Sequence, residues 1–294
     1  MSAKVLVVGD VMTDIIVMPE GPIVRGSDRR AQVRQRPGGS GANQAVWLGA
    51  MGADVVFAAR VGAEDKDRYE DYFRQRGVKP ALTGDAVLPS GVLVTMVDPD
   101  GERSFLTDRG ANLNLTGADL PGALLDGVGM VMISGYSFFA DAPREAVRAL
   151  VAEAKRRGIA VAIDPASEGF LAEVGADQFI DWTAGADWLF ANEDEARALC
   201  GAADAEACVM ALGAHYGQVV LKRGRHGAAL GGRNGIELTL PAPAVDVVDS
   251  TGAGDAFAAG FVAALLAGED KAGAMGKAIA AGARAVQSIG GQPG

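Results

Sequence analysis

The sequence predicts an α/β fold in which helices cover both faces of a doubly wound, mainly parallel sheet. Residues 5–8 form a short, wholly apolar run that ends at Gly9, as expected of a strand buried on both faces. From residue 130 onward, strand-like runs alternate with helical stretches of about ten to fifteen residues, which indicates βαβ units. No repeat, low-complexity tract or linker divides the 294 residues, so we expect one domain spanning 1–294.

The N-terminal half continues with two helix-like segments on either side of a second apolar strand. Residues 42–51 predict a helix, residues 55–61 a strand, and residues 66–76 a helix with a charged face. Gly52 and Gly77 stand where the C-terminal caps of these two helices are expected.

The C-terminal half predicts the rest of the sheet. Strand-like runs lie at 130–134, 159–164, 188–191 and 218–223, with helices opening at Pro143, Glu193 and Ala205. A hairpin-like run at 228–240 and two small-residue helices, from about 253 to 267 and from 271 to 288, complete the chain.

Two distant segments do not read as core strands. Residues 15–39 mix apolar and polar side chains with prolines and a cluster of arginines, and residues 91–110 alternate around a turn at 98–101. Polar-faced strands of this kind predict a small sheet outside the main one. We expect a β lid formed by about 12–38 and 86–110.

The charge balance excludes one class of function. The chain has 27 Lys or Arg against 37 Asp or Glu, a formal net charge of −10, and an isoelectric point near 4.8. Binding to phosphate backbones needs clustered basic residues, so we expect no nucleic-acid partner.

Cysteine usage and hydropathy exclude two further classes. Cys200 and Cys208 have no CxxC or CxxH spacing, so neither a zinc site nor a disulfide framework is expected. The N-terminal apolar run is too short for a signal peptide, and no stretch approaches ~18 uninterrupted apolar residues. We therefore expect a cytoplasmic protein with no membrane partner.

The segment 247–266 carries the clearest chemistry. An apolar strand end runs into a small-residue turn, Gly252 to Gly254, followed by Asp255 and an Ala-rich helix. The free N–H groups at such a helix N-terminus favour an anion. Asp255 is then either an ordinary acidic residue that complements the helix dipole or the base that accepts a proton from a hydroxyl attacking a phosphoryl group.

Two motifs carry a family resemblance that covers nearly the whole chain. The run DSTGAGDAF at 249–257 closely resembles the C-terminal signature of the ribokinase family of carbohydrate kinases, also called the phosphofructokinase-B family. Residues 36–65 resemble its N-terminal signature, about 200 residues upstream. A dinucleotide-binding reading of either glycine-rich run fails by spacing, because Gln44 and Phe257 fall where the third glycine belongs. The resemblance implies a ribokinase-like fold with a β lid.

The resemblance places a sugar site in the N-terminal part of the chain. The opening GDVMTDII puts the sugar-binding Asp of the family on Asp14, and Gly38, Gly39 and Asn43 then line the sugar. A carboxylate at the end of a parallel strand can accept hydrogen bonds from two vicinal hydroxyls, although Asp14 as a simple cap is the alternative. Ser40 stands where ribokinases often carry Lys, which leaves ribose itself open.

The resemblance also implies a nucleotide and metal site. ANEDEARAL at 191–199 is similar to the Asn-x-x-Glu element that places Asn192 and Glu195 near Mg²⁺ and its water shell. An acidic first turn favoured by the helix dipole explains these residues equally well.

A glycine hairpin adds to the expected nucleotide site. Residues 219–230 resemble the strand and hairpin beside the nucleotide, which brings Lys222, Gly224 and Gly227 to ATP. Which of Lys222, Arg223 and Arg225 contact phosphate is left open. In several relatives the loop before the anion site also binds an activating K⁺; Asp249 and Thr251 match one side of it, and the alternative is that Asp249 only orders the turn.

The expected function is ATP-dependent phosphorylation of a primary hydroxyl of a small sugar. In it Asp255 is the general base, the N–H groups of Gly252, Ala253 and Gly254 stabilise the transferring phosphoryl group, and Mg²⁺ bridges the nucleotide phosphates. A nucleoside kinase of the same family is the alternative enzyme, and a non-catalytic sugar- or nucleotide-binding regulator the alternative from another class. The resemblance further implies a homodimer formed through the lid. The identity of the sugar is left open, since it depends on lid side chains and on the segment near Tyr136.

Overall fold

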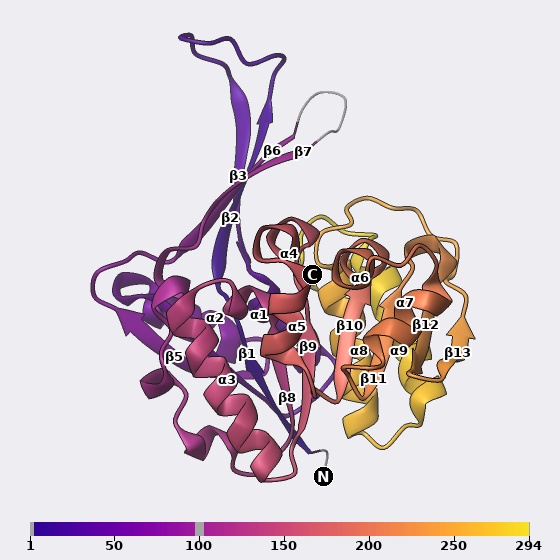
Figure 1. Ribbon diagram of the computed structural model, residues 1–294. Coiled ribbons are helices and arrows are strands. Elements are labelled where there is room, and N and C mark those ends of the chain that lie inside the picture. Colours follow the sequence, from indigo (N-terminus) through magenta and orange to yellow (C-terminus); the bar gives the residue numbers. More distant parts are fainter. Residues whose placement is uncertain (1–2, 98–102, 294) are drawn as a thin grey trace.

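A computed structural model describes residues 3–97 and 103–293, which form a nine-stranded and a four-stranded sheet with helices around the larger one (Figure 1). The strands of the main sheet are, in spatial order, β13 (Gly235–Leu240), β12 (Ala228–Gly232), β11 (Gln218–Lys222), β10 (Trp188–Asn192), β9 (Ala160–Asp164), β8 (Val128–Ser134), β1 (Lys4–Val8), β4 (Val55–Gly62) and β5 (Val78–Asp85).

Strands β11 through β5 pair in parallel, whereas β12 and β13 continue the sheet as antiparallel strands. The order places β1 in the interior of the sheet, between β8 and β4. Parallel strands end at a common edge, so the residues at the carboxyl ends of β1, β9, β10 and β11 become neighbours although they are far apart in sequence. Ligands bind at this edge of an open α/β sheet.

Helices cover both faces of the main sheet, as the sequence predicts (Figure 1). They are α1 (Ser40–Ala50), α2 (Lys66–Arg74), α3 (Asp141–Arg156), α4 (Glu168–Val174), α5 (Ala176–Thr183), α6 (Glu193–Cys200), α7 (Ala205–Leu212), α8 (Ala253–Leu266) and α9 (Lys271–Ala285). Short 3₁₀ helices lie in the connections: η1 (Ala63–Asp65), η2 (Gly110–Asn114), η3 (Gly117–Asp119), η4 (Gly122–Leu125), η5 (Gly135–Phe138) and η6 (Gly224–His226).

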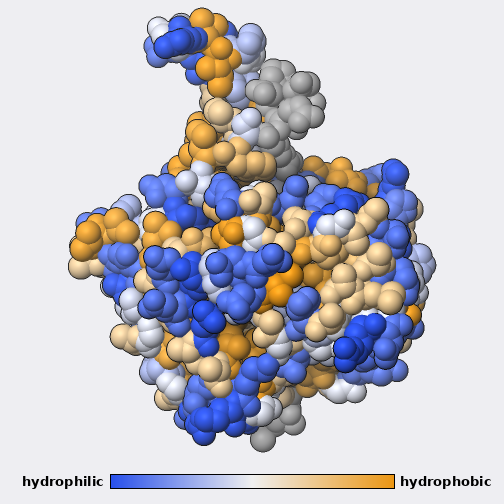
Figure 2. Space-filling model, in the orientation of Figure 1, coloured by the Kyte–Doolittle hydropathy of each residue, from blue (hydrophilic) through white to orange (hydrophobic). Residues whose placement is uncertain are grey.

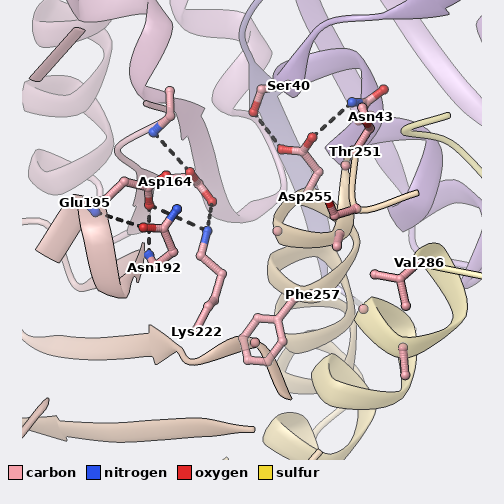
Figure 3. Close-up of a pocket in the computed structure, with 18 of the residues that line it drawn as sticks. Ser40, Asn43, Asp164, Asn192, Glu195, Lys222, Thr251, Asp255, Phe257 and Val286 are labelled. Carbon is pink, nitrogen blue, oxygen red and sulfur yellow. Dashed lines mark hydrogen bonds and ion pairs between the residues drawn. The ribbon is translucent and has the colours of Figure 1, made fainter. Parts of the chain in front are cut away.

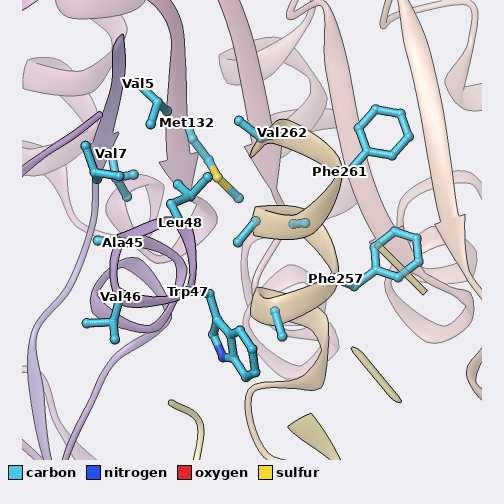
Figure 4. Packing of buried hydrophobic residues seen from close by; sticks show 14 of the residues in the cluster. Val5, Val7, Ala45, Val46, Trp47, Leu48, Met132, Phe257, Phe261 and Val262 are labelled. Carbon is cyan, nitrogen blue, oxygen red and sulfur yellow. The ribbon is translucent and has the colours of Figure 1, made fainter. Parts of the chain in front are cut away.

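The alternation of side chains along β1 divides the core into two layers. Val5 and Val7 pack with the buried residues of α1, α8 and α9, and Figure 4 shows Leu48, Phe261 and other members of this layer. Leu6 and Val8 belong to the opposite layer, with α3, α5, α6 and α7. Because successive side chains of a strand point to opposite faces, one apolar strand supports both layers.

The second sheet has the order β3-β2-β6-β7 and joins two segments distant in sequence. Its strands are β2 (Met12–Pro19), β3 (Ala31–Gly38), β6 (Gly91–Val97) and β7 (Arg103–Asp108). Figure 1 shows this sheet rising from the main body, and Figure 2 shows its orange apolar residues on the projecting arm. The turn expected at 98–101 lies outside the described residues. We call this sheet the lid sheet.

Two elements differ from the expectation. Residues 78–85 form β5, which the irregular pattern around Lys79 and Pro80 concealed; the strand lies at the sheet edge, where a proline is tolerated. Helix α9 ends at Ala285 rather than near residue 288, because the Val286 carbonyl accepts hydrogen bonds from the N–H groups of Val248 and Asp249. Among the described residues, none of the helices combines the length and apolar character needed to span a bilayer.

Candidate active site

A cavity of about 950 Å³ lies where the carboxyl edge of the main sheet, the base of the lid sheet and the N-terminus of α8 meet. Most of the predicted site residues line it; Gly38 and Asp249 do not. We call the part beside Asp14 and Asn43 the sugar end, and the part beside Lys222 and α8 the phosphate end. Figure 3 shows the phosphate end, together with the carboxylate of Asp255, which lies between the sugar end and the phosphate end.

The turn before α8 depends on a glycine. Gly252 is the N-cap of α8 and has a φ of 72°, in the left-handed region that favours glycine. A Cβ atom built there would lie 2.4 Å from the Cα atom of Gly291, so no side chain fits. The turn presents the first N–H groups of a 14-residue helix to the cavity; that of Ala253 makes a long bond, 3.3 Å, to the Ser250 carbonyl.

The carboxylate of Asp255 is held by side chains from α1. Ser40 Oγ and Gln44 Nε2 donate to Oδ1 at 2.7 and 3.2 Å, and Asn43 Nδ2 donates to Oδ2 at 3.0 Å. Burial, together with the nearby charge of Asp164, raises the pKa of Asp255 to about 7. A carboxyl group fixed in this way can accept or release a proton near neutral pH.

Lys222 lies at the centre of the phosphate end, at the last position of β11. Its ammonium group is 2.8 Å from Asp164 Oδ2 and 4.0 Å from Glu195 Oε2, and its side chain is 11% exposed. Burial lowers the pKa of Lys222, but the charges of Asp164 and Glu195 outweigh it and hold that pKa above its ordinary value. A Cβ atom at Gly254 would lie 3.2 Å from Nζ, so this fixed positive charge adjoins the α8 turn.

Asn192 and Glu195 form a capping box at the start of α6. The Glu195 N–H donates to Asn192 Oδ1 and the Asn192 N–H donates to Glu195 Oε2, both at 2.8 Å. The acidic first turn expected from the sequence therefore has a structural role. Burial raises the pKa of Glu195 to about 7, although Lys222 opposes the rise.

The other two basic residues of the hairpin, Arg223 and Arg225, make their contacts away from Asp164 and Glu195. Arg223 Nε donates to Glu193 at 3.3 Å, and Arg225 Nε lies 3.4 Å from His226 Nε2. Both residues line the cavity with Gly224 and Gly227, but Lys222 is the one that contacts the carboxylates of the phosphate end.

Asp14 lies at the sugar end, on β2 beside β3. A Cβ atom at Gly38 would lie 2.1 Å from Asp14 Oδ2, so glycine is required there for the carboxylate to fit. Burial and the charge of Asp10 raise the pKa of Asp14 to about 7. Two buried acceptor oxygens of residues that line this end have no hydrogen-bond partner among the described residues: Asp14 Oδ1 and Asn43 Oδ1. Ligand hydroxyl groups are the donors that would satisfy them.

Asp249 connects the α8 turn to the C-terminal segment. Its Oδ1 accepts from the Thr251 N–H and hydroxyl at 2.9 and 2.7 Å, and its Oδ2 accepts from the Gly290 N–H at 2.9 Å. Trp47 Nε1 and Arg36 Nη1 donate to the carbonyls of the same segment, at Gly291 and Ile289. Asp249 therefore orders the turn.

The residues of the phosphate end fit a magnesium ion held mainly by water and nucleotide phosphates. The described part of the chain has no group of three or more His, Cys, Asp or Glu side chains placed to bind a metal by themselves. Asp164 and Glu195 nevertheless border the cavity, and one or two carboxylates suffice for Mg²⁺ beside phosphate oxygens.

Sequence reasoning did not single out several residues of the cavity. Asp10 lies two residues after the end of β1, and its Oδ1 accepts from the Gly41 N–H at 3.1 Å and from Ser134 Oγ at 3.3 Å. Asp164 ends β9 and Arg109 follows β7. For Asp10 and Asp164 a signal was present, because both stand at the end of a buried strand in a parallel sheet. For Arg109, no local sequence pattern indicated a position in the cavity.

Comparisons with known proteins are consistent with this geometry. A family model described as pfkB family carbohydrate kinase matches residues 2–294. "Bifunctional protein HldE" of Shewanella baltica strain OS155 is 31% identical over 292 residues, which cover 91% of this chain and 56% of the relative. The protein of the same name from Pseudomonas putida strain W619 is 32% identical, covering 95% of this chain and 59% of the relative. The chain thus spans little more than half the length of these curated relatives.

Solved structures share the fold over the whole chain. Thermotoga maritima ribokinase superposes with a TM-score of 0.82 at 25% identity, covering 99% of this chain and 95% of the other. Sinorhizobium meliloti adenosine kinase superposes with 0.85 at 21% identity, covering 100% and 96%. Cryptococcus neoformans ribokinase in complex with ADP superposes with 0.77 at 22% identity, covering 99% and 96%.

Proposed function

Because this chain belongs to the pfkB family of carbohydrate kinases, we propose that it transfers a phosphoryl group from ATP to a primary hydroxyl of a small sugar. The observation that carries the proposal is Asp255, held by Ser40, Asn43 and Gln44 in the cavity wall at the first turn of α8. Binding alone has no use for a carboxyl group of raised pKa beside an anion site. The placement therefore supports catalysis over a non-catalytic sugar- or nucleotide-binding regulator.

Asp255 acts in this proposal as the general base. Its pKa of about 7 leaves the proton-accepting form populated at neutral pH. The hydrogen bonds from α1 fix the carboxylate between the sugar end and the phosphate end. The hydroxyl proton passes to Asp255 while the hydroxyl oxygen attacks the γ-phosphorus of ATP in line; the bond from that phosphorus to the β–γ bridging oxygen breaks, and ADP leaves.

The α8 turn and Lys222 stabilise the charge that develops on the transferring group. The N–H groups of Gly252, Ala253 and Gly254 lie at the positive end of the helix dipole, and the long Ala253 bond to Ser250 is readily exchanged for a phosphate oxygen. Lys222 adds a full positive charge beside Gly254. Because Asp164 and Glu195 hold its ammonium group, little reorganisation is needed when phosphate arrives.

Asp164, Glu195 and Asn192 are the residues that would hold Mg²⁺ through its water shell. Magnesium, when bound, neutralises charge on the nucleotide phosphates. Lys222 keeps the two carboxylates from repelling the nucleotide before the ion is in place.

The nucleotide base has an apolar position next to the phosphate end. Phe257, Ile279 and Val286 line this part of the cavity together with small residues of the 242–245 segment. Gly224 and Gly227 complete the wall on the β11 side. An apolar slot that leads to a helix N-terminus suits a flat base joined to a chain of phosphates.

A nucleoside is the second candidate acceptor, and one observation favours it. Tyr136 and Phe170 line the sugar end with ring centroids 5.4 Å apart, and aromatic faces of this kind can stack on a base. The solved adenosine kinase of Sinorhizobium meliloti shares the fold.

A coupled ADP-release assay over pentoses, hexoses, sugar phosphates and nucleosides tests both candidates. Turnover of any sugar, lost in Asp255→Asn, supports the proposed function, and turnover of nucleosides alone supports the alternative. ATP binding with no turnover of any compound would leave the regulator as the function.

We also propose that two chains associate through the lid sheet. Val33, Phe105 and Leu106 are 59%, 56% and 60% exposed there, and a sheet with apolar residues and free edges tends to be covered. Light scattering at micromolar concentration should give twice the chain mass of 30.0 kDa, and a mass of 30.0 kDa would contradict the dimer.

Activation by K⁺ is the remaining proposal. An ion near Asp249 and Thr251 would share the carboxylate that now orders the turn, and would hold the α8 N–H groups toward phosphate. Exchange of K⁺ for tetramethylammonium at fixed ionic strength should then lower kcat. An unchanged kcat and KM would mean that Asp249 serves the turn alone.

A further inference from the structure

Arg109 places a guanidinium group at the sugar end of the cavity, where the proposed function has no role for it. The residue follows β7 at the base of the lid sheet and lines the cavity with Asp10, Asp14 and Tyr136. The other basic residues of the cavity wall, at 222, 223 and 225, all belong to the β11 end. Among the described lining residues, Arg109 is thus the one cation on the sugar side.

The guanidinium is held in place by its neighbours. It lies over the Tyr136 ring, 4.5 Å from the ring centroid, and Tyr136 is itself packed edge-on against Phe170 at 5.4 Å. Nη1 lies 3.4 Å from Asp10 Oδ2. A stacked guanidinium with an ion-pair partner has lost most of its rotational freedom before any ligand binds.

The same guanidinium has few protein partners for its N–H groups. Its side chain is 16% exposed, and the 3.4 Å contact to Asp10 is longer than the usual range for such bonds. Asp10 meanwhile receives bonds from Gly41 and Ser134, so its negative charge is already shared. A guanidinium that is largely removed from water with most donors unused is completed best by a ligand oxyanion, which can take two parallel bonds.

The charges around the sugar end accommodate such a ligand. Asp10 and Arg109 balance each other, and the raised pKa of Asp14 means that this carboxyl group carries only part of a negative charge at pH 7. The unpartnered oxygens of Asp14 and Asn43 take hydroxyl donors, so the same end can bind both the hydroxyls and an anion.

Resting on the proposed kinase function, we propose that the acceptor is an anionic sugar, a sugar acid or a sugar phosphate, whose carboxylate or phosphate binds Arg109. Its free hydroxyl at the other end faces Asp255. The pair Arg109–Tyr136 then selects the substrate by charge, and the cavity discriminates against the neutral sugar of the same skeleton.

Matched substrate pairs test this inference: D-glucose with D-gluconate, and D-fructose with D-fructose 6-phosphate and D-fructose 1-phosphate. ADP release is measured for wild type, Arg109→Gln, Arg109→Lys and Arg144→Gln. Arg144 is the matched control, because it also stacks on an aromatic ring, Trp182 at 4.2 Å, but does not line the cavity.

For the wild type we expect kcat/KM to be at least about 10-fold higher for an anionic member than for its neutral partner. Arg109→Gln should lower that value by about 10- to 100-fold for the anionic member and by less than about 3-fold for the neutral one, the size of a lost charged hydrogen bond. Arg109→Lys should recover part of the loss, and Arg144→Gln should change neither value. Gluconate and the phosphates distinguish a carboxylate site from a phosphate site.

Preference for the neutral sugars, or an equal loss for both members in Arg109→Gln, would overturn the inference while the kinase function stands. Calorimetric titration of the same compounds in the presence of a non-hydrolysable ATP analogue gives an answer independent of turnover. If no compound is phosphorylated but the anionic sugars bind wild type and not Arg109→Gln, the kinase function fails and the anion site stands. Absence of binding by every anionic member to wild type would exclude the site.

Discussion

Asp164 and Glu195 at the phosphate end of the cavity, and Asp255 between the two ends, all have partners within the protein. At the sugar end, Asp14 Oδ1 and Asn43 Oδ1 have none among the described residues. Both ends contain carboxyl groups of raised pKa. The difference lies in what satisfies these groups: Lys222 and the α1 side chains in one case, and the hydroxyl groups of a ligand in the other.

The comparison relates each end to its task. Phosphoryl transfer needs charges that are fixed before the reaction, because reorganising them during the reaction raises the barrier. Sugar binding needs open acceptors, since a buried acceptor without a partner costs about 1–3 kcal/mol that a ligand hydroxyl recovers. Substitutions at the two ends should therefore differ in kind.

The largest effect is expected for Asp255→Asn. The amide cannot accept the hydroxyl proton, so kcat should fall by ~10²–10⁴-fold, while the Kd for ATP changes little. Single-turnover kinetics with a titration of ATP binding measure both. A variant that keeps more than about a tenth of the wild-type kcat would remove Asp255 from the role of base.

Lys222→Met should lower the free energy of unfolding, because Lys222 pairs with the buried carboxylates of the phosphate end. Removal of the ammonium leaves Asp164 and Glu195 buried without their cation, which typically costs about 3–5 kcal/mol of unfolding free energy. The loss should be smaller at pH 6 than at pH 8, because Glu195, whose pKa is already raised, can take up a proton.

Urea unfolding at the two pH values measures the loss in Lys222→Met. Arg223→Met is the control, since its partner Glu193 is half-exposed and the pair should contribute less than about 1 kcal/mol. Equal changes in unfolding free energy in the two variants would contradict the role of Lys222 as the cation that stabilises buried Asp164 and Glu195.

Asp14→Ala should behave in the opposite way. Because Asp14 Oδ1 bonds to nothing in the protein, the unfolding free energy should stay level or rise, while the KM for the sugar increases about 10- to 100-fold and the KM for ATP is unchanged. Thr13→Ala, which alters the neighbouring residue that bonds to Tyr69 on the other side of β2, is the control. Equal losses for sugar and ATP would point to damage of the fold.

The pH dependence gives the smallest expected effect. With a pKa of about 7, Asp255 is protonated at lower pH, so kcat should fall by about tenfold per pH unit below 7 and level off above it. The free energy of unfolding should change with pH in the opposite direction to kcat. Because the raised pKa means that the folded state binds this proton more tightly than the unfolded state, the contribution of Asp255 to stability declines as pH rises from about 4 through 7. A kcat that is flat from pH 5.5 to 8 would exclude the titration of Asp255 from the rate.

The sequence alone determined the approximate positions of most elements, although not of β5, and it marked several residues that line the cavity. The apolar run 5–8 predicts β1 because a strand buried on both faces has no polar positions, and the small-residue turn before Asp255 predicts the N-terminus of α8. The family match confirms the resemblance found in the two glycine-rich motifs. These features are local, since burial, turn chemistry and helix capping involve neighbours in the chain.

The tertiary structure decided which of these residues meet. Lys222 and Asp164 are 58 positions apart, and Ser40 and Asp255 are 215 apart; both pairs are in contact because sheet order and helix packing bring the ends of distant elements together. The stacking of Arg109 on Tyr136 has the same origin. Periodicity shows which face of an element is buried, but the neighbour across that face depends on the long-range packing of the whole chain, and so the partner of each charge is decided only in the folded protein.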